Sequence, residues 1–164
     1  MEQIKTYYNF ALNDYNFLQK SVESGLVYNG MCSMAQNCAE RFLKHIIEPF
    51  ATIQNNTAVM RAHDLTTLKS FITANLSEFT GEWGKIMLCN GYYFSARYPG
   101  DNAIFAEEQD VKDCWLAVTA AKIAVEQYMN TKEWLAITNQ LSPSKSDIEE
   151  IIAETIEDKE DYGE

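Results

Sequence analysis

A stripe of polar side chains follows one face of a helix that the sequence predicts between residues 30 and 48. Gln36, Glu40 and Lys44 are spaced i, i+4 and i+8, so they lie one above another along the helix. Glu40 and Lys44 have opposite charges and suit a helical ion pair worth about 0.2–0.5 kcal/mol. The stripe is either part of a ligand site or a solvated edge of an amphipathic helix, and spacing alone fits both.

A lone arginine lies within a tyrosine-rich segment ahead of a strong turn signal. The segment reads Tyr92-Tyr93-Phe94-Ser95-Ala96-Arg97-Tyr98-Pro99-Gly100. The guanidinium of Arg97 could hold a phosphate through paired N–H groups. Tyr92, Tyr93 or Tyr98 could stack on a base. Alternatively, Arg97 ties helices together through an ion pair with Glu40 or Asp14, and the tyrosines belong to the core or to an interface.

His63 immediately precedes a predicted helix start. Asp64 is a good N-cap for the helix that follows it. His63 could therefore add a hydrogen-bond donor near the positive end of the helix dipole, where anions bind. The alternative role is local, because the side chain could instead cap the helix or anchor the loop.

Apolar residues recur at helical spacing along most of the chain. The expected elements are a helix over residues 2–23, a second over 30–48 that Pro49 ends, a polar loop over 51–62, a third helix from about Asp64, a fourth over 81–94, and a long fifth over 107–138 that can break near Asn130 and Thr131. No long alternating stretch favours a sheet. The sequence therefore predicts an all-α fold, an antiparallel up-and-down bundle of about five helices.

The end of the chain has a different composition from the rest. Residues 141–164 hold nine acidic and two basic residues, so −7 of the net charge of −11 lies there. The Ser146-x-x-Glu149 capping box predicts a short helix from Ile148 to about Ile156. We expect a helical bundle over 1–140 and an acidic extension over 141–164. That extension is either a solvated end or a cover for a basic groove.

Charge and composition exclude several classes of function. The net charge of −11 disfavours general DNA binding, which needs clustered basic residues. The sequence carries neither a membrane-spanning apolar run nor a signal-peptide pattern at its start, so we expect a cytoplasmic protein without a membrane partner. The four cysteines form no C-x-x-C pair, and we expect buried free thiols and neither a metal nor a cofactor.

Three segments, in this order and at these separations, carry a resemblance to a known family. They read Ala35-Gln36-Asn37-Cys38-Ala39-Glu40-Arg41-Phe42-Leu43-Lys44, His63-Asp64-Leu65 and Arg97-Tyr98-Pro99. The chain resembles the HEPN family (higher eukaryotes and prokaryotes nucleotide-binding), and Ala11, Asp14 and Tyr15 fit its first helix. The resemblance covers about residues 5 to 130. Cys38 departs from it, because the family usually has Ala or Gln there.

The resemblance implies a helical bundle, commonly a homodimer, with a groove that binds a nucleotide or RNA. It also implies the residues of that groove: Gln36, Glu40, Lys44, His63, Tyr93, Arg97 and Tyr98. Many members have a nucleotidyltransferase partner. Others are metal-independent ribonucleases of toxin–antitoxin and defence systems, in which an Arg-x(4–6)-His motif pairs a phosphate-binding arginine with a proton-transferring histidine.

This chain departs from the ribonuclease motif. Arg97 occupies the arginine position, but no histidine follows it in the sequence. Arg41 and His45 have the right types with a spacing that is one residue short. We therefore expect a non-catalytic module that binds a nucleotide or assists a nucleotidyltransferase. The alternatives are a ribonuclease and a helical protein-interaction domain without a small ligand.

Overall fold

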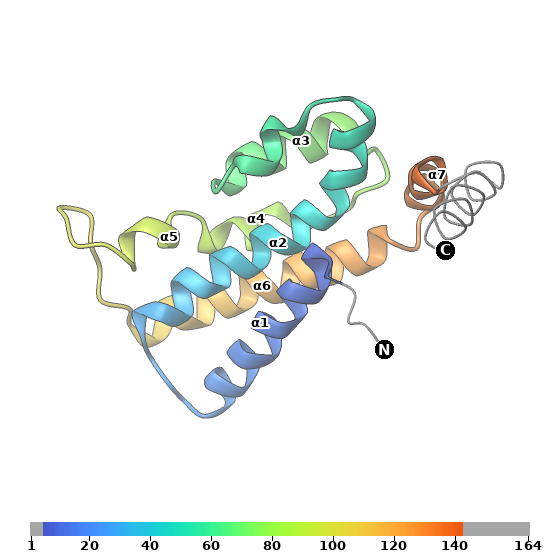
Figure 1. The fold of residues 1–164 in the computed structure, drawn as a ribbon. Coiled ribbons are helices and arrows are strands. Elements are labelled where there is room, and N and C mark those ends of the chain that lie inside the picture. Colours follow the sequence, from blue (N-terminus) through green and yellow to red (C-terminus); the bar gives the residue numbers. More distant parts are fainter. Residues whose placement is uncertain (1–4, 143–164) are drawn as a thin grey trace, which may run out of the picture.

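The structure is a computed structural model that describes residues 5–142, and within that range every regular element is a helix (Figure 1). The longer helices are α1 (Tyr7–Glu23), α2 (Asn29–Ile53), α3 (Leu65–Asn75), α6 (Glu108–Tyr128) and α7 (Lys132–Leu141). The shorter turns are η1 (Thr57–Arg61), α4 (Trp83–Ile86), η2 (Met87–Cys89) and α5 (Tyr92–Ser95). The predicted all-α bundle is confirmed.

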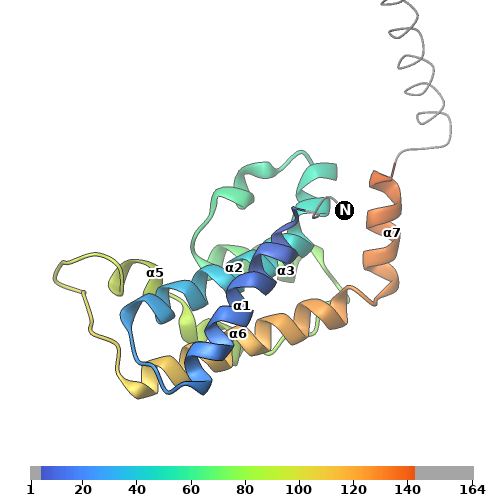
Figure 2. The ribbon, with the colours of Figure 1, turned by 60° about the horizontal axis from the view of Figure 1, so that its bottom comes forward.

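Helix α2 is the centre of the bundle. It packs along α1 and α6, and α3, η1 and α5 also contact it (Figures 1 and 2). Its apolar stripe includes Phe42, Leu43, Ile46 and Ile47, none of which is exposed. Burying one such side chain contributes about 1.5–3 kcal/mol, so this stripe fixes α2 against its neighbours.

The second helix does not end where Pro49 predicts. Helix α2 continues to Ile53 with Pro49 inside it. A proline inside a helix costs about 3 kcal/mol because it removes one backbone hydrogen bond and crowds the preceding turn. Here Phe50 and Ala51 are buried in the core, and their burial favours continuing the helix. The expected polar loop is correspondingly shorter and includes the 3₁₀ turn η1.

The predicted fourth helix is not one continuous helix. Residues 83–95 form α4, η2 and α5 as separate turns. The break falls at Asn90 and Gly91, because Gly91 has a φ of 100°. That left-handed backbone conformation favours glycine and interrupts a right-handed helix. The chain thereby turns before Tyr93, which becomes important at the candidate site.

The long final helix breaks near Asn130 and Thr131, as the sequence allows. Helix α6 ends at Tyr128, and the Thr131 side chain accepts a hydrogen bond from the Trp134 backbone N–H to begin α7. At the other end of the chain, Thr6 caps α1, so the first helix starts at Tyr7. The helix expected over 148–156 lies outside the described residues, and the division at residue 140 stays a prediction.

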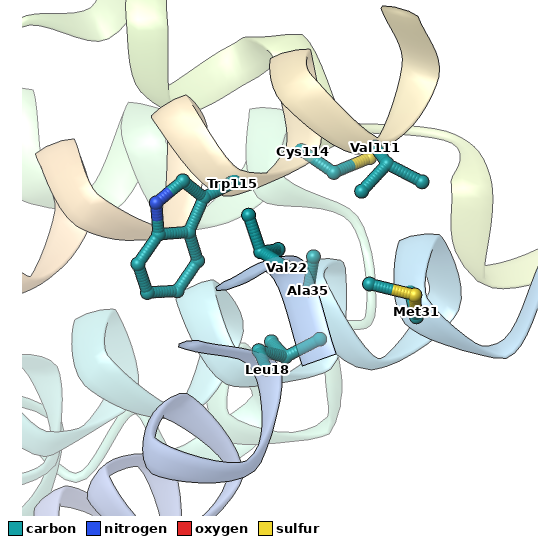
Figure 3. Close-up of a pocket in the computed structure, with 7 residues that line it drawn as sticks. All are labelled: Leu18, Val22, Met31, Ala35, Val111, Cys114 and Trp115. Carbon is teal, nitrogen blue, oxygen red and sulfur yellow. The ribbon is translucent and has the colours of Figure 1, made fainter. Parts of the chain in front are cut away.

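The contact between α1, α2 and α6 is tightly packed. Figure 3 shows the small apolar hollow between them, which is lined by Leu18, Val22, Met31, Ala35, Val111, Cys114 and Trp115. Its volume is about 10 Å³, at the limit for one water molecule. This interface therefore leaves no room for a ligand. All four cysteines are buried free thiols.

No helix in the part of the chain that the structure describes combines the length and the apolar character needed to cross a bilayer.

One glutamate fixes the start of α7. The Glu133 carboxylate accepts hydrogen bonds from the Ser77 and Glu78 backbone N–H groups and from the Tyr128 hydroxyl. Partial burial raises the pKa of Glu133, but hydrogen bonds from Glu78, Ser77 and Tyr128 outweigh it, so the net pKa lies below its ordinary value.

Glu133→Gln should therefore lower the free energy of unfolding by about 2 kcal/mol at pH 7, because the Ser77 and Glu78 donors lose a charged acceptor. Since the folded-state pKa is lowered, this contribution is present above about 4.5, the ordinary value. It is lost as the pH falls through the folded pKa. Urea unfolding at pH 7 and pH 3 measures both. Equal losses at the two pH values, or a loss no larger than that of the exposed control Glu82→Gln, would contradict the assignment.

Candidate functional site

The polar stripe of α2 is buried. Gln36, Glu40 and Lys44 are 2%, 4% and 3% exposed. The interpretation of this stripe as a solvated edge is therefore wrong. A charge removed from water is tolerated only when it is paired and hydrogen-bonded, so the contacts of Glu40 and Lys44 constrain their surroundings.

The Glu40 carboxylate contacts the side chains of both Lys44 and His63. Its Oε1 atom lies 2.6 Å from the Lys44 Nζ atom, within α2. The same oxygen lies 3.3 Å from Nδ1 of His63, on the segment between η1 and α3. The His63 side chain is 52% exposed. Thus a buried ion pair holds a histidine that solvent and ligands can reach.

Gln36 joins the same stripe to two loops. Its Nε2 group donates a 2.9 Å hydrogen bond to the His63 carbonyl oxygen. Its Oε1 atom accepts a 2.7 Å bond from the Tyr93 backbone N–H. Because Gln36 is buried and both of its amide ends are bonded, α2 sets the positions of the segment before α3 and of α5.

A second set of contacts fixes α3 against α5. Asp64 caps α3, as predicted, by accepting from the Thr66 and Thr67 backbone N–H groups. The Asn90 side chain accepts from the Leu65 N–H and donates to Asp64, at 3.1 Å each. Although desolvation raises the pKa of Asp64, the hydrogen bonds from Thr66, Asn90 and Thr67 lower it below its usual value. Asp64 is therefore an ionised, structural cap.

Aromatic contacts complete the cluster. The His63 and Tyr93 rings are stacked, with centres 5.2 Å apart and an interplanar angle of 4°. The Arg97 guanidinium carbon lies 4.8 Å from the Tyr93 ring centre and 5.7 Å from that of Tyr98. A chain of contacts therefore joins all seven predicted site residues: Gln36, Glu40, Lys44, His63, Tyr93, Arg97 and Tyr98. Their role in binding stays a prediction.

Arg97 does not form the ion pair with Glu40 or Asp14 that the sequence allowed. Asp14 pairs with Arg41, and Glu40 pairs with Lys44. Among residues 5–142, no carboxylate forms an ion pair with Arg97, whose side chain is exposed. Its N–H groups are therefore available to an anion, and the nearby rings stabilise the cation.

Arg97 borders a surface hollow of about 380 Å³. Tyr98 lines it from the same turn, and Asn29, Ile104 and Phe105 line it from elsewhere. The volume lies in the range of small-molecule sites. Sequence reasoning did not single out Asn29 or Phe105 as site residues, because Asn29-Gly30 reads only as a turn signal and neither residue belongs to the segments that carry the family resemblance.

The other arginine–histidine pair lies apart from this cluster. Arg41 is bound to Asp14. The His45 ring contacts the rings of Tyr8 and Trp134, and burial lowers its pKa. Both residues therefore hold helices together.

A second surface hollow, of about 350 Å³, lies between α1 and α2 and includes Lys5, Phe10 and Arg41 in its lining.

Tyr92 also has a structural role. Its hydroxyl donates a 2.6 Å hydrogen bond to Asp110 of α6, and burial together with that bond raises its pKa. Because Tyr92 ties α5 to α6, it is not available as a base platform.

A protein-family model, the HEPN domain, matches residues 4–128. The chain belongs to the HEPN family. The match includes all seven of the joined site residues and ends at Tyr128, the last residue of α6. Helix α7 of this HEPN protein lies beyond the match. No curated protein and no solved structure matches the chain significantly. In residues 5–142 of this HEPN chain, no group of three or more His, Cys, Asp or Glu side chains is arranged to hold a metal ion.

The buried pair can be tested by removing one partner. Lys44→Met should lower the free energy of unfolding by about 3–5 kcal/mol, because it leaves the Glu40 carboxylate buried without its cation. The double variant Glu40→Leu/Lys44→Met should recover much of that loss. Urea denaturation measures both.

Lys85→Met is the matched control, because Lys85 forms an exposed ion pair with Glu82. It should cost at most about 1 kcal/mol. If Lys44→Met cost no more than this control, the pair would not be the buried constraint described here.

Proposed function

We propose that this HEPN domain is a non-catalytic module that binds a nucleotide, with Arg97 holding the phosphate. The observation that carries the proposal is an exposed guanidinium between two tyrosine rings with no carboxylate partner among the described residues. An arginine in such a position offers a planar set of donors to a phosphate.

The buried polar stripe of α2 supports this proposal, because it holds the site residues in place before a ligand binds. Gln36 fixes the Tyr93 backbone, and Glu40 fixes the His63 ring that stacks on Tyr93. The Tyr93 ring in turn lies beside Arg97. A site whose groups are already held loses less entropy on binding. Tyr93 therefore has a positioning role in the proposal, since its ring already contacts His63 and Arg97.

The proposed partners are a nucleotidyltransferase and a second copy of the chain, and the support for both is membership of the HEPN family. Two exposed phenylalanines on α1, Phe10 and Phe17, lie two helical turns apart. Exposed aromatic side chains are typical of protein contact surfaces. Size-exclusion chromatography with light scattering measures the oligomeric state directly.

The proposed function predicts stabilisation by a nucleotide. Thermal unfolding of the full chain should be measured with ATP, ADP, GTP, AMP and a short RNA, each at a saturating level. A ligand at 100 times its dissociation constant stabilises the folded state by about 2.7 kcal/mol, which raises the midpoint by several degrees for a chain of this size. Arg97→Ala should abolish the rise.

The control is Lys20→Ala, which removes one exposed positive charge from α1. It should keep the rise seen with the full chain. If none of the five ligands raises the midpoint, or if Arg97→Ala and Lys20→Ala behave alike, the Arg97 site is not a nucleotide site.

A metal-independent ribonuclease is the second candidate, and one observation favours it. His63, which does not follow Arg97 in sequence, contacts the same Tyr93 ring that Arg97 contacts. A histidine can move protons near pH 7, and an arginine can stabilise the charge on a phosphate. The pair is thus of the right chemical type, although it lacks the spacing of the family motif.

The non-catalytic proposal predicts that the full chain leaves a single-stranded RNA intact in buffer containing EDTA. Denaturing gel electrophoresis of a labelled RNA measures this. Cleavage that both His63→Ala and Arg97→Ala abolish and that Lys20→Ala retains would overturn the non-catalytic proposal in favour of the ribonuclease.

A further inference from the structure

Phe105 is the most exposed large apolar residue in the described part of the chain. Its side chain is 92% exposed, whereas Tyr98 and Phe94 on the neighbouring turn are 53% and 63% exposed. Phe105 lies in the segment between α5 and α6, which projects from one end of the bundle (Figure 1). An aromatic ring in this position makes little contribution to the folded chain itself.

The backbone on both sides of Phe105 is nevertheless firmly held. The Asn29 side chain donates a 2.7 Å hydrogen bond to the Ile104 carbonyl and accepts a 2.6 Å bond from the Ala106 N–H. The Ile104 N–H also donates to the Ser95 carbonyl, at 2.9 Å. Three hydrogen bonds therefore fix the position at which an apolar ring points into solvent. An exposed ring on a backbone that is already held can stack on a planar ligand without the entropic cost of ordering the loop.

Phe105 and Arg97 border the same hollow of about 380 Å³. One wall therefore offers a cation to a phosphate, and the other offers a free aromatic ring. The Tyr93 ring is already engaged with His63 and Arg97, so Phe105 is the better platform for a base. A cation and an aromatic ring on one hollow suit a ligand that joins a phosphate to a planar heterocycle.

We propose that Phe105 stacks on the base of the nucleotide whose phosphate Arg97 holds, with Asn29 as the residue that positions it. This inference rests on the proposed function and adds to it a residue that recognises the base. The occupant is a nucleotide with its base attached, and a sugar phosphate alone does not satisfy the site. Asn29 acts by holding the loop, because both ends of its side-chain amide are already bonded to the backbone of Ile104 and Ala106.

The test compares two probes that share the phosphate and the sugar. Isothermal titration calorimetry of the full chain gives the affinities for AMP and for ribose 5-phosphate. The full chain should bind AMP about 5-fold to 150-fold more tightly, which is the range that base stacking on one aromatic ring supplies. Phe105→Ala should reduce this ratio to near one and leave the affinity for ribose 5-phosphate unchanged. Phe105→Trp should preserve the ratio.

Leu135→Ala is the matched control, because Leu135 is also an exposed apolar residue, on α7, and it should preserve the ratio. Asn29→Ala should lower the AMP affinity only, since it releases the loop. If Phe105→Ala binds AMP as the full chain does, or if the full chain does not favour AMP over ribose 5-phosphate, the inference is overturned. The proposed function survives either of these results provided that Arg97→Ala abolishes binding. Failure of the full chain to bind either probe would overturn the inference, and it would overturn the proposed function as well only if ATP, ADP, GTP and the short RNA also leave the unfolding midpoint unchanged.

The same variants separate the base platform from a protein-contact surface. A change in oligomeric state in Phe105→Ala, with an unchanged AMP affinity, would assign the ring to a protein interface and overturn the base-stacking inference.

Discussion

The buried ion pair between Glu40 and Lys44 is the constraint on which the arrangement of the site depends. Both side chains lie inside α2's packed surface, and Glu40 has its second contact with His63. An unpaired charge in this position would be strongly destabilising. The chain therefore folds so that the segment before α3 lies against α2. Gln36, one turn earlier, then holds the α5 backbone in the same way.

This arrangement separates stability from binding. The apolar face of α2 packs against α1 and α6, and the hollow where these three helices meet holds about 10 Å³. The polar face holds His63 and Tyr93, and through the Tyr93 ring it reaches Arg97. The buried polar side chains of α2 thus hold the side chains of the site that solvent can reach. A rigid, partly exposed cluster of this kind is what a binding site requires, and it explains why a chain of net charge −11 can still offer one local cation.

The sequence predicts the elements whose signals are local. Helical periodicity and the Asp64 cap give the bundle and the start of α3 correctly. It fails where tertiary contacts outweigh a local signal, because burial of the residues after Pro49 continues α2 and the φ of Gly91 divides the predicted fourth helix. Residue types and spacing single out the candidate site residues, but only the family resemblance assigns them to one groove. The i, i+4 spacing predicts the pairing of Glu40 with Lys44, but the burial of that pair and the exposure of Phe105 depend on residues far away in the chain, which no spacing reveals.

A nuclear magnetic resonance titration of the isotope-labelled full chain with AMP locates the nucleotide site residue by residue. We predict saturable shifts in the backbone signals of His63, Tyr93, Arg97 and Phe105, with the α1 signals unchanged. Two results would contradict the claim that the buried polar stripe of α2 organises a nucleotide site. One is a set of shifts confined to the residues that line the second hollow, between α1 and α2, and the other is no saturable shift at all.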